Sequence, residues 1–527
     1  MPKDEVENMG MEEAIKELYS RREKAKQMGG EEKVRRQHEH GRLTARERID
    51  RLLDPNSFWE VGILNTSDVP EMAEVTPADG RVCGIGTIEG RKVAVVAEDR
   101  TVLGGSGGRI GTKVKMANLY KIANEKGYPV IGLGDDSGGV RLPDQMGSIG
   151  MTRTRNIGAG FKHHTFQLPR QTPRISAIMG ECFGEPSWNA ARADFVVMVK
   201  GATMAAAGPR IIEQAIGEKI TPQQLGGWEI HANFTGQVDA FAENDEECLS
   251  IIRKLLSYMP SHNGEEPPYL ATQDDPYRRL EDVGGIVPYQ LNRGYDMHRL
   301  IKAIVDDGKY FPLKAEWAKA LITCLARIGG RVVGIIANNP MYNAGAPDVP
   351  AIEKETNFIC LCDSFNIPII FLTDIPGMFP GKDAEKQKLP TKIVVLLEAM
   401  DLATVPKVGI LVRKAYGIGW QCMGLSHEDV YVAWPTASIS FVDTEIGVDL
   451  VHGRAIAEAQ DPEAEKKRLL EQWVADSAPW GGASVSPLDV IDPRDTRKFL
   501  AEVLDILRGN RGNSIGEHKL ANWPTGF

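Results

Sequence analysis

The sequence lacks the features that mark membrane, disulfide-bonded and nucleic-acid-binding proteins. No stretch reaches about 18 uninterrupted apolar residues, the length that a membrane-spanning helix needs. Its seven cysteines include one close pair, Cys360 and Cys362, which has neither a zinc-ribbon nor a redox Cys-x-x-Cys spacing. Lys and Arg number 62 against 72 Asp and Glu, and the net charge of −10 gives no electrostatic footprint for nucleic acid. We therefore expect a cytoplasmic protein with reduced thiols, and no membrane or nucleic-acid partner.

What the chain does contain is an internal repeat, with the second copy about 235 to 240 residues after the first. The ordered matches are residues 88–97 with 328–337, 129–138 with 368–377, 173–184 with 406–417, and 194–197 with 429–432. Each match joins an apolar strand to a similar turn. Four matches in the same order predict a duplicated domain.

The apolar pattern predicts the fold class of each copy. A chain of 527 residues is too long for a single hydrophobic core. Strands rich in Val and Ile alternate with longer helical stretches such as residues 113–126, which is typical of α/β layers. The Pro-rich polar segment 259–268 can continue neither a helix nor a central strand, so we expect domains at residues 1–262 and 263–527. Further helices are expected at residues 11–33, 44–53, 461–474 and 492–509.

Two glycine-rich turns follow apolar strands in the first copy. The loop Gly104-Gly105-Ser106-Gly107-Gly108 precedes a helix, and such a loop can direct backbone N–H groups at an anion. The turn at residues 135–141 carries Ser137, Gly138, Gly139 and Arg141, and its counterpart at 374–381 carries Gly377. A flexible surface turn for the first loop and a capped helix start for the second remain the alternatives.

A third pair of glycines lies where a helix begins after a buried strand, at Phe183-Gly184-Glu185 and Tyr416-Gly417-Ile418. Backbone N–H groups at such a position can hold a developing negative charge, which makes an oxyanion hole. The alternative is a glycine needed only for tight packing.

Side-chain catalysts are less well supported by the sequence. Glu181 and Glu185 flank Gly184 and leave open an acid–base pair of the hydratase kind. His163 and His164 have no third ligand nearby, so we interpret them as structural or as part of a pocket wall.

With these motifs in view, the chain resembles the carboxyltransferase (β) subunit of biotin-dependent acyl-CoA carboxylases, of the propionyl-CoA carboxylase type. The resemblance covers almost the whole chain and rests on residues 40–49, 76–80, 104–106, 136–139, 225–227, 365–368, 374–377, 404–408, 413–417, 492–493 and 496–497. It implies two tandem crotonase-like domains, and an active site between the first domain of one protomer and the second of another. It also implies a homo-oligomer, commonly a hexamer.

The resemblance further implies a role for each motif. The acyl-CoA would lie near Gly104 to Ser106 and Ser137 to Gly139 with Arg141, while carboxybiotin from a separate subunit would meet Gly377 and Gly419. The amides of Gly184 and Glu185 would hold the thioester enolate, and those of Gly417 and Ile418 the ureido oxygen of biotin. Trp188, Trp420 and Gln421 would shape the acyl pocket. Because this chain has no Ala-Met-Lys-Met biotin attachment site, the biotin must come from another chain. The resemblance also implies a partner biotin carboxylase that uses ATP and bicarbonate.

Three departures from the family pattern are present, two that bear on the acyl substrate and a third that bears on the biotin side. The first oxyanion loop reads Gly184-Glu185-Pro186 in place of Gly-Gly-Ala, and the second reads Gly417-Ile418-Gly419. The family's Arg-His-Gly-Ala-Lys stretch appears here as residues 391–395, Thr-Lys-Ile-Val-Val. The sequence therefore predicts carboxyl transfer to an acyl-CoA of non-standard side chain. A carboxyacyl-CoA decarboxylase, with or without biotin, and a non-catalytic acyl-CoA-binding assembly subunit remain as alternatives.

Overall fold

The computed structural model describes residues 10–135, 138, 141, 146–150, 152, 169–508 and 518–523. The chain divides into two compact units, Met1–Leu256 and Ser257–Thr525, so the division falls shortly before the Pro-rich segment. All seven cysteines are buried and free of disulfides. Within the described ranges, the helices are too short or too polar to cross a membrane.

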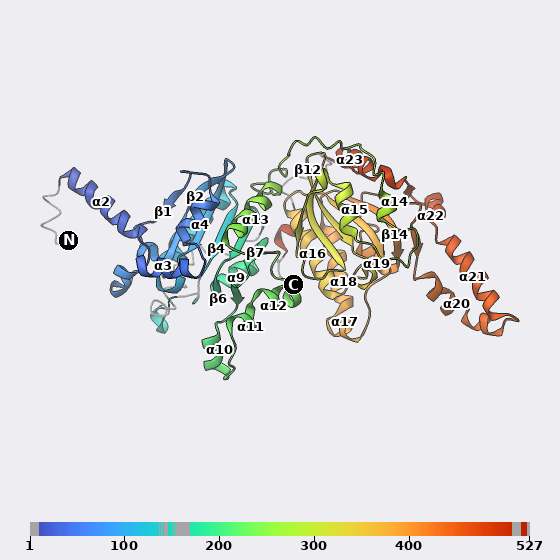
Figure 1. Cartoon of the computed structure of the whole chain (residues 1–527), viewed down its shortest axis with the longest axis horizontal. Helices are drawn as coiled ribbons and strands as arrows, with labels where there is room; N and C mark the ends of the chain where they lie inside the picture. Colours follow the sequence, from blue (N-terminus) through green and yellow to red (C-terminus); the bar gives the residue numbers. More distant parts are fainter. Residues whose placement is uncertain are drawn as a thin grey trace. The chain divides into compact units, whose positions relative to one another are not determined.

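The first unit is built on a mixed sheet with the strand order β1-β2-β3-β4-β5-β7-β9 (Figure 1). The strands are β1 (Trp59–Val61), β2 (Arg81–Ile88), β3 (Arg91–Glu98), β4 (Val130–Gly134), β5 (Arg174–Ile178), β7 (Phe195–Val199) and β9 (Ala240–Ala242), with β6 (Glu181–Phe183) and β8 (Thr203–Ala205) as a separate pair. The helices are α2 (Met11–Lys26), α3 (Glu31–Glu39), α4 (Ala45–Leu52), α5 (Ala117–Lys126), α9 (Glu185–Ala191), α10 (Pro209–Ile216), α11 (Pro222–Gly226), α12 (Trp228–Ile230) and α13 (Asp245–Tyr258).

The second unit repeats this topology with the order β10-β11-β12-β13-β14-β15-β17, and β16 pairs with β14. The strands are β10 (Tyr310–Leu313), β11 (Leu321–Ile328), β12 (Arg331–Asn338), β13 (Ile369–Ile375), β14 (Lys407–Tyr416), β15 (Val430–Ala433), β16 (Ser438–Ser440) and β17 (Asp489–Val490). The helices are α14 (Val283–Ile286), α15 (Met297–Ile304), α16 (Val349–Ser364), α17 (Lys382–Lys386), α18 (Leu389–Leu402), α19 (Gly417–Cys422), α20 (Thr444–Glu458), α21 (Pro462–Asp476), α22 (Pro479–Val485) and α23 (Thr496–Leu507).

Pairing within the two sheets confirms the duplication. In each unit the first three strands are antiparallel and the later ones parallel. Glu89 and Gly90 have φ of 51° and 78° at the β2–β3 turn, and Gly329 and Gly330 have 58° and 80° at the β11–β12 turn. Positive φ at both central residues is the type I′ hairpin, whose twist matches that of the strands.

A buried lysine is repeated at the same place in both units. Lys115 donates to the carbonyl oxygens of Gly62, Ala78 and Arg81, at 3.3 Å from Gly62 O and 2.8 Å from Ala78 O. Lys354 donates to the carbonyl oxygens of Lys314, Trp317 and Leu321, at 3.0, 2.9 and 2.7 Å. Each lysine satisfies three buried carbonyl groups in the segments beside the sheet.

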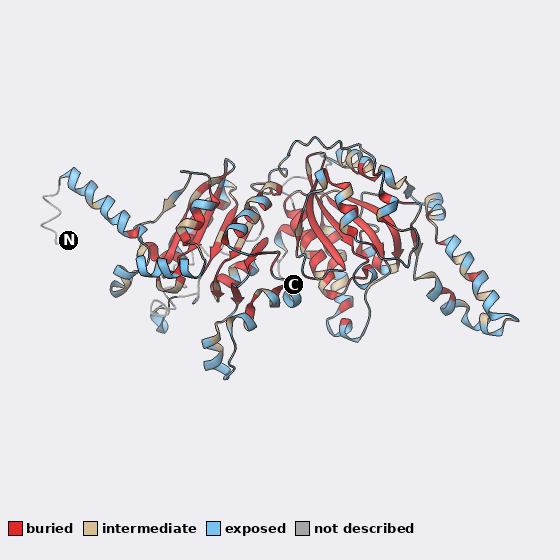
Figure 2. Ribbon diagram, viewed as in Figure 1, coloured by how far each residue is buried: buried red, intermediate tan, exposed pale blue. Residues whose placement is uncertain are grey.

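The core of the second unit shows how the sheet is covered. Side chains from one face of β11 to β15 pack with α15 and α23, including Ile301, Ile335 and Leu500, which are fully buried. Helices α16 and α18 pack together, and α16 also contacts β11. Figure 2 shows the strands buried in both units, whereas α2, α20 and α21 are largely exposed.

Most helices that we expected from the sequence are present, with one correction. The stretch 11–33 contains two helices, α2 and the start of α3, because Met28 and Gly30 adopt φ of 54° and 94° between them. Thr44 caps α4, as its spacing to Glu47 indicates: the Thr44 hydroxyl accepts from the Glu47 N–H, and the Glu47 carboxylate accepts from the Thr44 N–H.

Candidate functional site

The glycine-rich loop of the first unit is a tight turn that depends on left-handed backbone. Leu103, Gly104 and Gly105 have φ of 51°, 73° and 83°. The Gly105 N–H donates to Val102 O at 3.0 Å, and the Arg81 guanidinium donates to Gly105 O. Ser106 follows in extended conformation, and a π-helix at Ile110–Met116 leads into α5. The loop is therefore held from below by a buried arginine.

Arg141 lies against this loop, as its place in the predicted CoA site requires, but its charge is already used. Its N–H donates to Gly107 O at 3.2 Å, and its guanidinium pairs with Asp79. Its side chain is only 3% exposed. A Cβ on Gly108 would overlap the Arg141 guanidinium, which explains a glycine there. Arg141 thus fixes the shape of the loop. Gly138 is exposed, whereas Ser137 and Gly139 lie outside the described residues.

Gly184 turns the chain from β6 into α9. Its φ and ψ of 76° and −121° are accessible to glycine and strained for other residues. The Gly184 N–H donates to Ala205 O at 3.1 Å and thereby extends the β6–β8 pairing, so this amide of the predicted oxyanion hole is engaged within the chain. Glu185 is the first residue of α9 and is buried, and Trp188 is 55% exposed on the same helix.

Asp135 forms a charged hub at the end of β4. It is fully buried and accepts from Arg48 Nη1 at 3.0 Å and from Gln37 Nε2 at 2.8 Å. Arg42 Nη1 and Arg100 Nη1 lie at 3.9 and 3.8 Å from its second oxygen. Burial alone would lower the pKa of Arg48, but the carboxylates of Asp135 and Asp245 raise it above its usual value. The hub fixes several cations beside the glycine-rich loop.

A basic cavity of about 500 Å³ opens beside Gly104 and this hub. Its walls come from α3, the segment after it and the segment after β3, and its lining residues are Lys33, Arg36, Gln37, His40, Arg42, Arg100, Thr101, Leu103, Gly104 and Glu181. Glu181 pairs with Arg100 at 2.9 Å, which occupies it in an ion pair and gives no support to an acid–base pair with Glu185. The cavity can accept a large anion.

Sequence reasoning missed this cavity, although a signal was present. Lys33, Arg36, Gln37 and His40 follow the i, i+3, i+4, i+7 spacing of one helix face. The helix that we expected ended at Lys33, so this face was not recognised. Arg42 and Arg100 could not be added from sequence, because only the folded chain brings them to the same face.

Gly417 occupies the equivalent position in the second unit. Its φ is 51°, and a Cβ there would lie 2.6 Å from Phe441 O, so both backbone shape and space require glycine. It is the first residue of α19, and Ile418 after it is 40% exposed. Because the first N–H groups of a helix lack intrahelical acceptors, this turn can present amides to an oxygen atom.

Gly419 and Gly377 contact each other beneath this turn. A Cβ on Gly419 would lie 2.9 Å from Gly377 Cα, and one on Gly377 would meet nothing within 4 Å. The structure therefore brings together three glycines of the predicted biotin site, with open space beside Gly377. Gln421 is exposed on α19.

Trp420 packs against the core of the second unit. Its ring packs edge-on against Tyr431, with centroids 6.3 Å apart, and against a cluster that includes Leu411 and Ala437. This contact assigns Trp420 to the core beneath α19, and its predicted place in the acyl pocket gains no support from its packing.

Among the described residues, no group of three or more His, Cys, Asp or Glu side chains is arranged to hold a metal ion. His163 and His164 lie outside those residues. The described site thus consists of glycine turns, helix starts and cations.

Comparison with known proteins gives consistent matches over nearly the whole chain. Residues 36–519 match the carboxyl transferase domain family. The chain is 38% identical over 524 residues to a propionyl-CoA carboxylase carboxyltransferase subunit of Haloferax mediterranei, covering 98% of this chain and 100% of the relative. It is 35% identical over 514 residues to a methylmalonyl-CoA decarboxylase subunit alpha of Veillonella parvula, covering 95% and 97%.

Among solved structures, the chain is similar to transcarboxylase 12S, a hexamer with methylmalonyl-CoA bound. The TM-score is 0.89 at 35% sequence identity, covering 95% of this chain and 97% of that one. The match confirms the expected pair of crotonase-like α/β domains.

Proposed function

This chain belongs to the carboxyl transferase domain family, and we propose that its two copies divide the reaction between them. It is a carboxyltransferase of the propionyl-CoA carboxylase and transcarboxylase type. In our proposal the first copy binds the acyl-CoA and the second receives carboxybiotin from a separate subunit. The observation that carries this division is the basic cavity beside Gly104.

The cavity fits the nucleotide end of coenzyme A. The phosphates of that end carry several negative charges, and Arg36, Arg42 and Arg100 line the cavity with Lys33. Guanidinium groups bind phosphate through paired N–H donors. Arg100 and Arg42 are oriented by the buried Asp135, so part of the entropic cost of arranging them is met before binding.

The turn at Gly184 would then serve the thioester. An acyl-CoA that loses its α-proton becomes an enolate, and its oxygen carries the developing charge. The first N–H groups of α9 are suited to hold that oxygen, with Pro186 as the one position that cannot donate. Burial of the reacting atoms strengthens each such hydrogen bond, because water no longer competes.

The second copy suits a neutral ring. Gly377, Gly417 and Ile418 surround the turn without a charged side chain, and the close contact of Gly419 with Gly377 leaves room for a flat group. Carboxybiotin, when bound, supplies the activated carboxyl group. The residues of this chain would bind its ring, orient it through the amides of α19 and exclude water.

The altered stretch 391–395 changes the charge beside this site. It lies in α18, where Lys392 pairs with Glu353 at 2.7 Å and Val394 is 52% exposed. The cation of Lys392 is therefore engaged within the chain. We propose that the changes at Glu185 and Ile418 reflect an acyl group of non-standard shape, with Trp188 and Gln421 at its pocket, whereas the altered stretch 391–395 bears on the biotin side.

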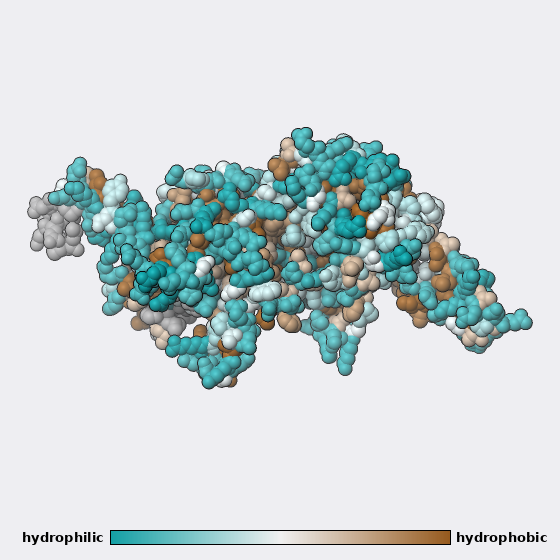
Figure 3. Space-filling model, in the orientation of Figure 1, coloured by the Kyte–Doolittle hydropathy of each residue, from teal (hydrophilic) through white to brown (hydrophobic). Residues whose placement is uncertain are grey.

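We propose that the chain acts as a homo-oligomer, and a hexamer by analogy with transcarboxylase 12S. Ile446, Leu450 and Val451 on α20 are 56%, 75% and 65% exposed, and Figure 3 shows apolar side chains gathered over α20 and α21. Apolar surface of this extent is typical of an interface. A biotin carboxylase and biotin carrier would complete the assembly.

A decarboxylase is the second candidate, because a relative at 35% identity is named methylmalonyl-CoA decarboxylase subunit alpha. Both directions pass through the same enolate, so the oxyanion turns serve either. The two candidates differ in which substrate supplies the carboxyl group.

One experiment separates these functions. The complex that the chain forms in its own cells is purified, probed for biotin and assayed with bicarbonate and ATP across a panel of acyl-CoAs. Labelling of one acyl-CoA together with a biotinylated partner supports the carboxylase. Release of CO2 from a carboxyacyl-CoA without carboxylation supports the decarboxylase. Acyl-CoA binding without turnover in either direction would leave a non-catalytic subunit.

A further inference from the structure

A second cavity lies in the second unit, at the opposite end of the sheet from the glycine turns. Its volume is about 330 Å³, within the range typical of small-molecule sites. Val332 and Val333 begin β12 there, and Pro368 and Pro406 immediately precede β13 and β14. Gly377 and Gly417 follow the other ends of those two strands. The cavity is therefore separate from the proposed carboxyl-transfer site.

Buried hydrogen bonds hold the walls of this cavity in place. Arg497, fully buried in α23, donates to the carbonyl oxygens of Asp274 and Asp275 and pairs with Asp306 at 2.7 Å. Asp306 in turn accepts from the N–H groups of Gly329 and Gly330 at 2.9 and 2.6 Å. These contacts fix the segment before Pro276 against the β11–β12 turn, so the wall is formed before any ligand binds.

The inner polar groups are satisfied by one another. Asn366 Nδ2 donates to Asn263 O and Glu265 O, which directs its Oδ1 to His518 Nε2 at 2.6 Å. The other ring nitrogen of His518 contacts Thr404 Oγ1 at 2.7 Å. With these groups occupied, the interior offers mainly apolar surface, from Ile328, Val333, Val405, Leu504 and Leu507.

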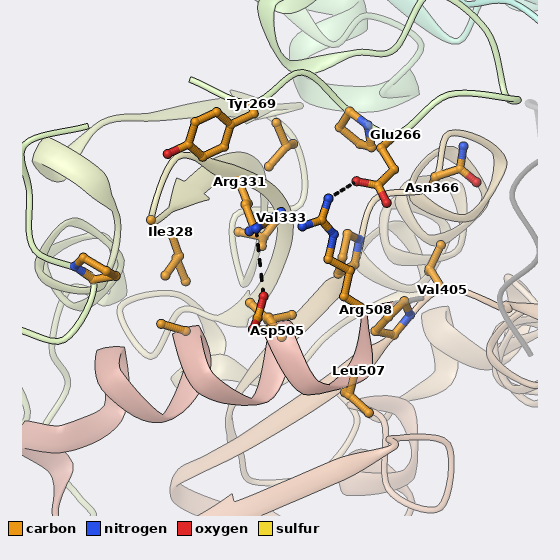
Figure 4. A pocket seen from close by; sticks show the side chains of 18 of the residues that line it. Glu266, Tyr269, Ile328, Arg331, Val333, Asn366, Val405, Asp505, Leu507 and Arg508 are labelled. Atoms are coloured by element: carbon orange, nitrogen blue, oxygen red, sulfur yellow. Dashed lines mark hydrogen bonds and ion pairs between the residues drawn. The ribbon is translucent and has the colours of Figure 1, made fainter. Parts of the chain in front are cut away.

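The rim carries charges of both signs (Figure 4). Arg508 and Glu266 form a close pair at 2.7 Å. Arg331 and Asp505 lie 3.9 Å apart, with side chains 42% and 72% exposed, and such a loose exposed pair contributes little to stability. The Arg331 guanidinium also lies over the ring of Tyr269, 5.9 Å from its centroid. Arg331 and Asp505 can therefore separate and pair with a ligand instead, at a small cost in free energy.

We propose that this cavity binds a zwitterionic α-amino acid with an apolar side chain. The ligand carboxylate pairs with Arg331, the ammonium group pairs with Asp505, and the side chain enters the apolar interior. Both rim charges keep an opposite partner in the complex. The last turn of α23 lines the cavity at Leu504 and Leu507, and the partial negative charge at a helix C-terminus favours an ammonium group there.

Simple anions fit this rim less well than a zwitterion does. A monocarboxylate would satisfy Arg331 but leave Asp505 beside a like charge. A phosphate ester would add a second negative charge near Glu266 and the end of α23. An amine alone would pair with Asp505 and leave Arg331 without a carboxylate partner. The pairing of charges at the rim thus selects a molecule that carries both signs.

The test is calorimetric titration of the full-length chain with L-leucine and with its two truncated analogues, 4-methylpentanoate and 3-methylbutylamine. We expect leucine to bind, and each analogue to bind at least about tenfold more weakly, because one charged partner is lost. Asp505→Asn should weaken leucine by a similar factor and should strengthen 4-methylpentanoate, because the like charge beside its carboxylate is removed. Arg331→Gln should weaken both.

Matched controls come from the same helix. Lys498 and Glu502 form another pair at 3.9 Å on α23, with side chains 50% exposed, and neither lines the cavity. Lys498→Gln and Glu502→Gln should leave leucine binding unchanged. Equal affinity for leucine and 4-methylpentanoate would contradict the requirement for a zwitterionic ligand. Leucine binding unaffected by Arg331→Gln and Asp505→Asn would contradict the location of the site at this rim. Absence of binding by leucine and phenylalanine, at concentrations on the order of 10 mM, would overturn the whole proposal.

Discussion

The two copies end their second parallel strand on the same carboxylate but surround it differently. Asp135 follows β4, and Asp374 is the residue before the last of β13. The N–H of each donates to a side chain of the preceding strand, Glu98 at 2.8 Å or Asn338 at 3.0 Å. Asp374 pairs with Arg413 at 2.9 Å, from the neighbouring strand of its own sheet. Asp135 pairs with arginines of the N-terminal segment and the segment after β3.

The difference shows how one scaffold can serve two ligands. In the second copy the cation completes an internal ion pair, and the turn beside it presents glycine and apolar side chains. In the first copy the added N-terminal helices bring cations to the rim of a cavity, which suits a polyanion such as coenzyme A. The sheet sets the positions of the turns, and the flanking segments determine what charge they accept.

The two copies also differ in the strand that leads to the oxyanion turn. In the first copy β5 and β6 are separated at Met179 and Gly180, whereas β14 runs unbroken from Lys407 to Tyr416. A Cβ on Gly180 would lie 1.7 Å from Asp135 Oδ1, so the carboxylate hub occupies the space that a side chain would need. The interruption of the strand and the charged hub are thus parts of one arrangement.

The largest expected effect is at Gly417. Gly417→Ala places a Cβ against Phe441 O and strains a residue with φ of 51°. Carboxyl transfer should fall by roughly 10²- to 10³-fold, the cost of losing one oxyanion donor. Acyl-CoA affinity, measured by calorimetry, should stay within about twofold because the first copy is untouched.

Gly284→Ala is the control for that change, since Gly284 is exposed and a Cβ there would meet nothing within 4 Å. Full transfer activity in Gly417→Ala would remove the second copy from the reaction. Loss of acyl-CoA binding in the same variant would contradict the division between copies.

Replacing the two tryptophans near the oxyanion turns should lower the stability of the protein by different amounts. Trp420 packs into the core beneath α19, so Trp420→Ala should lower the free energy of unfolding by about 2 to 3 kcal/mol. Trp188 is 55% exposed, and Trp188→Ala should change the free energy of unfolding by less than about 0.5 kcal/mol. Denaturant titration measures both. Equal losses would show that Trp188 is buried in the working assembly.

The basic cavity can be tested with two neighbouring arginines on α3. Arg36 lines the cavity and Arg35 does not, and the two are 67% and 72% exposed with an acidic partner one turn away, Glu32 or Glu39. Arg36→Gln should raise KM for acyl-CoA about five- to tenfold, the loss of one phosphate contact. Arg35→Gln should change KM for acyl-CoA less than twofold, which corresponds to less than roughly 0.4 kcal/mol. Similar effects from both variants would indicate a general electrostatic attraction of the substrate instead of a binding site at this cavity.

The smallest expected effect concerns pH and the repeated lysine. Burial lowers the pKa of Lys354 to about 7, below the ordinary value of 10.5 that the unfolded chain would show. Between these values the unfolded chain binds more protons at this lysine, so the contribution of Lys354 to stability rises with pH, by about 1 kcal/mol between pH 7 and pH 8. The change in stability between the two pH values should therefore be lower by that amount in Lys354→Met than in the unaltered chain, as measured by denaturant titration.

Lys115→Met provides the matched change in the first copy, where burial also lowers the lysine pKa. A stability profile that keeps its slope in Lys354→Met would show that this lysine stays charged within the fold.

Sequence reasoning reached the duplication and the glycine turns because both are local. A type I′ turn at Glu89 and Gly90, or a helix start after Gly184, depends on residues close together in the chain. The basic cavity was missed because it joins α3 to Arg100, and the ion pair of Arg141 with Asp79 could not be foreseen because the two residues lie 62 positions apart. Pairing of distant charges depends on the folded arrangement, which periodicity does not encode.

The central claim is that the coenzyme A part of the substrate binds to the first copy and not to the equivalent turn of the second. Hydrogen exchange of the full-length chain with and without propionyl-CoA tests it directly, because peptides from both copies report in one experiment. We predict protection at residues 33–42 and 100–106, and none at the equivalent turn of the second copy, Asn343 to Ala346. Protection at Asn343 to Ala346, or no protection at 100–106, would contradict the account.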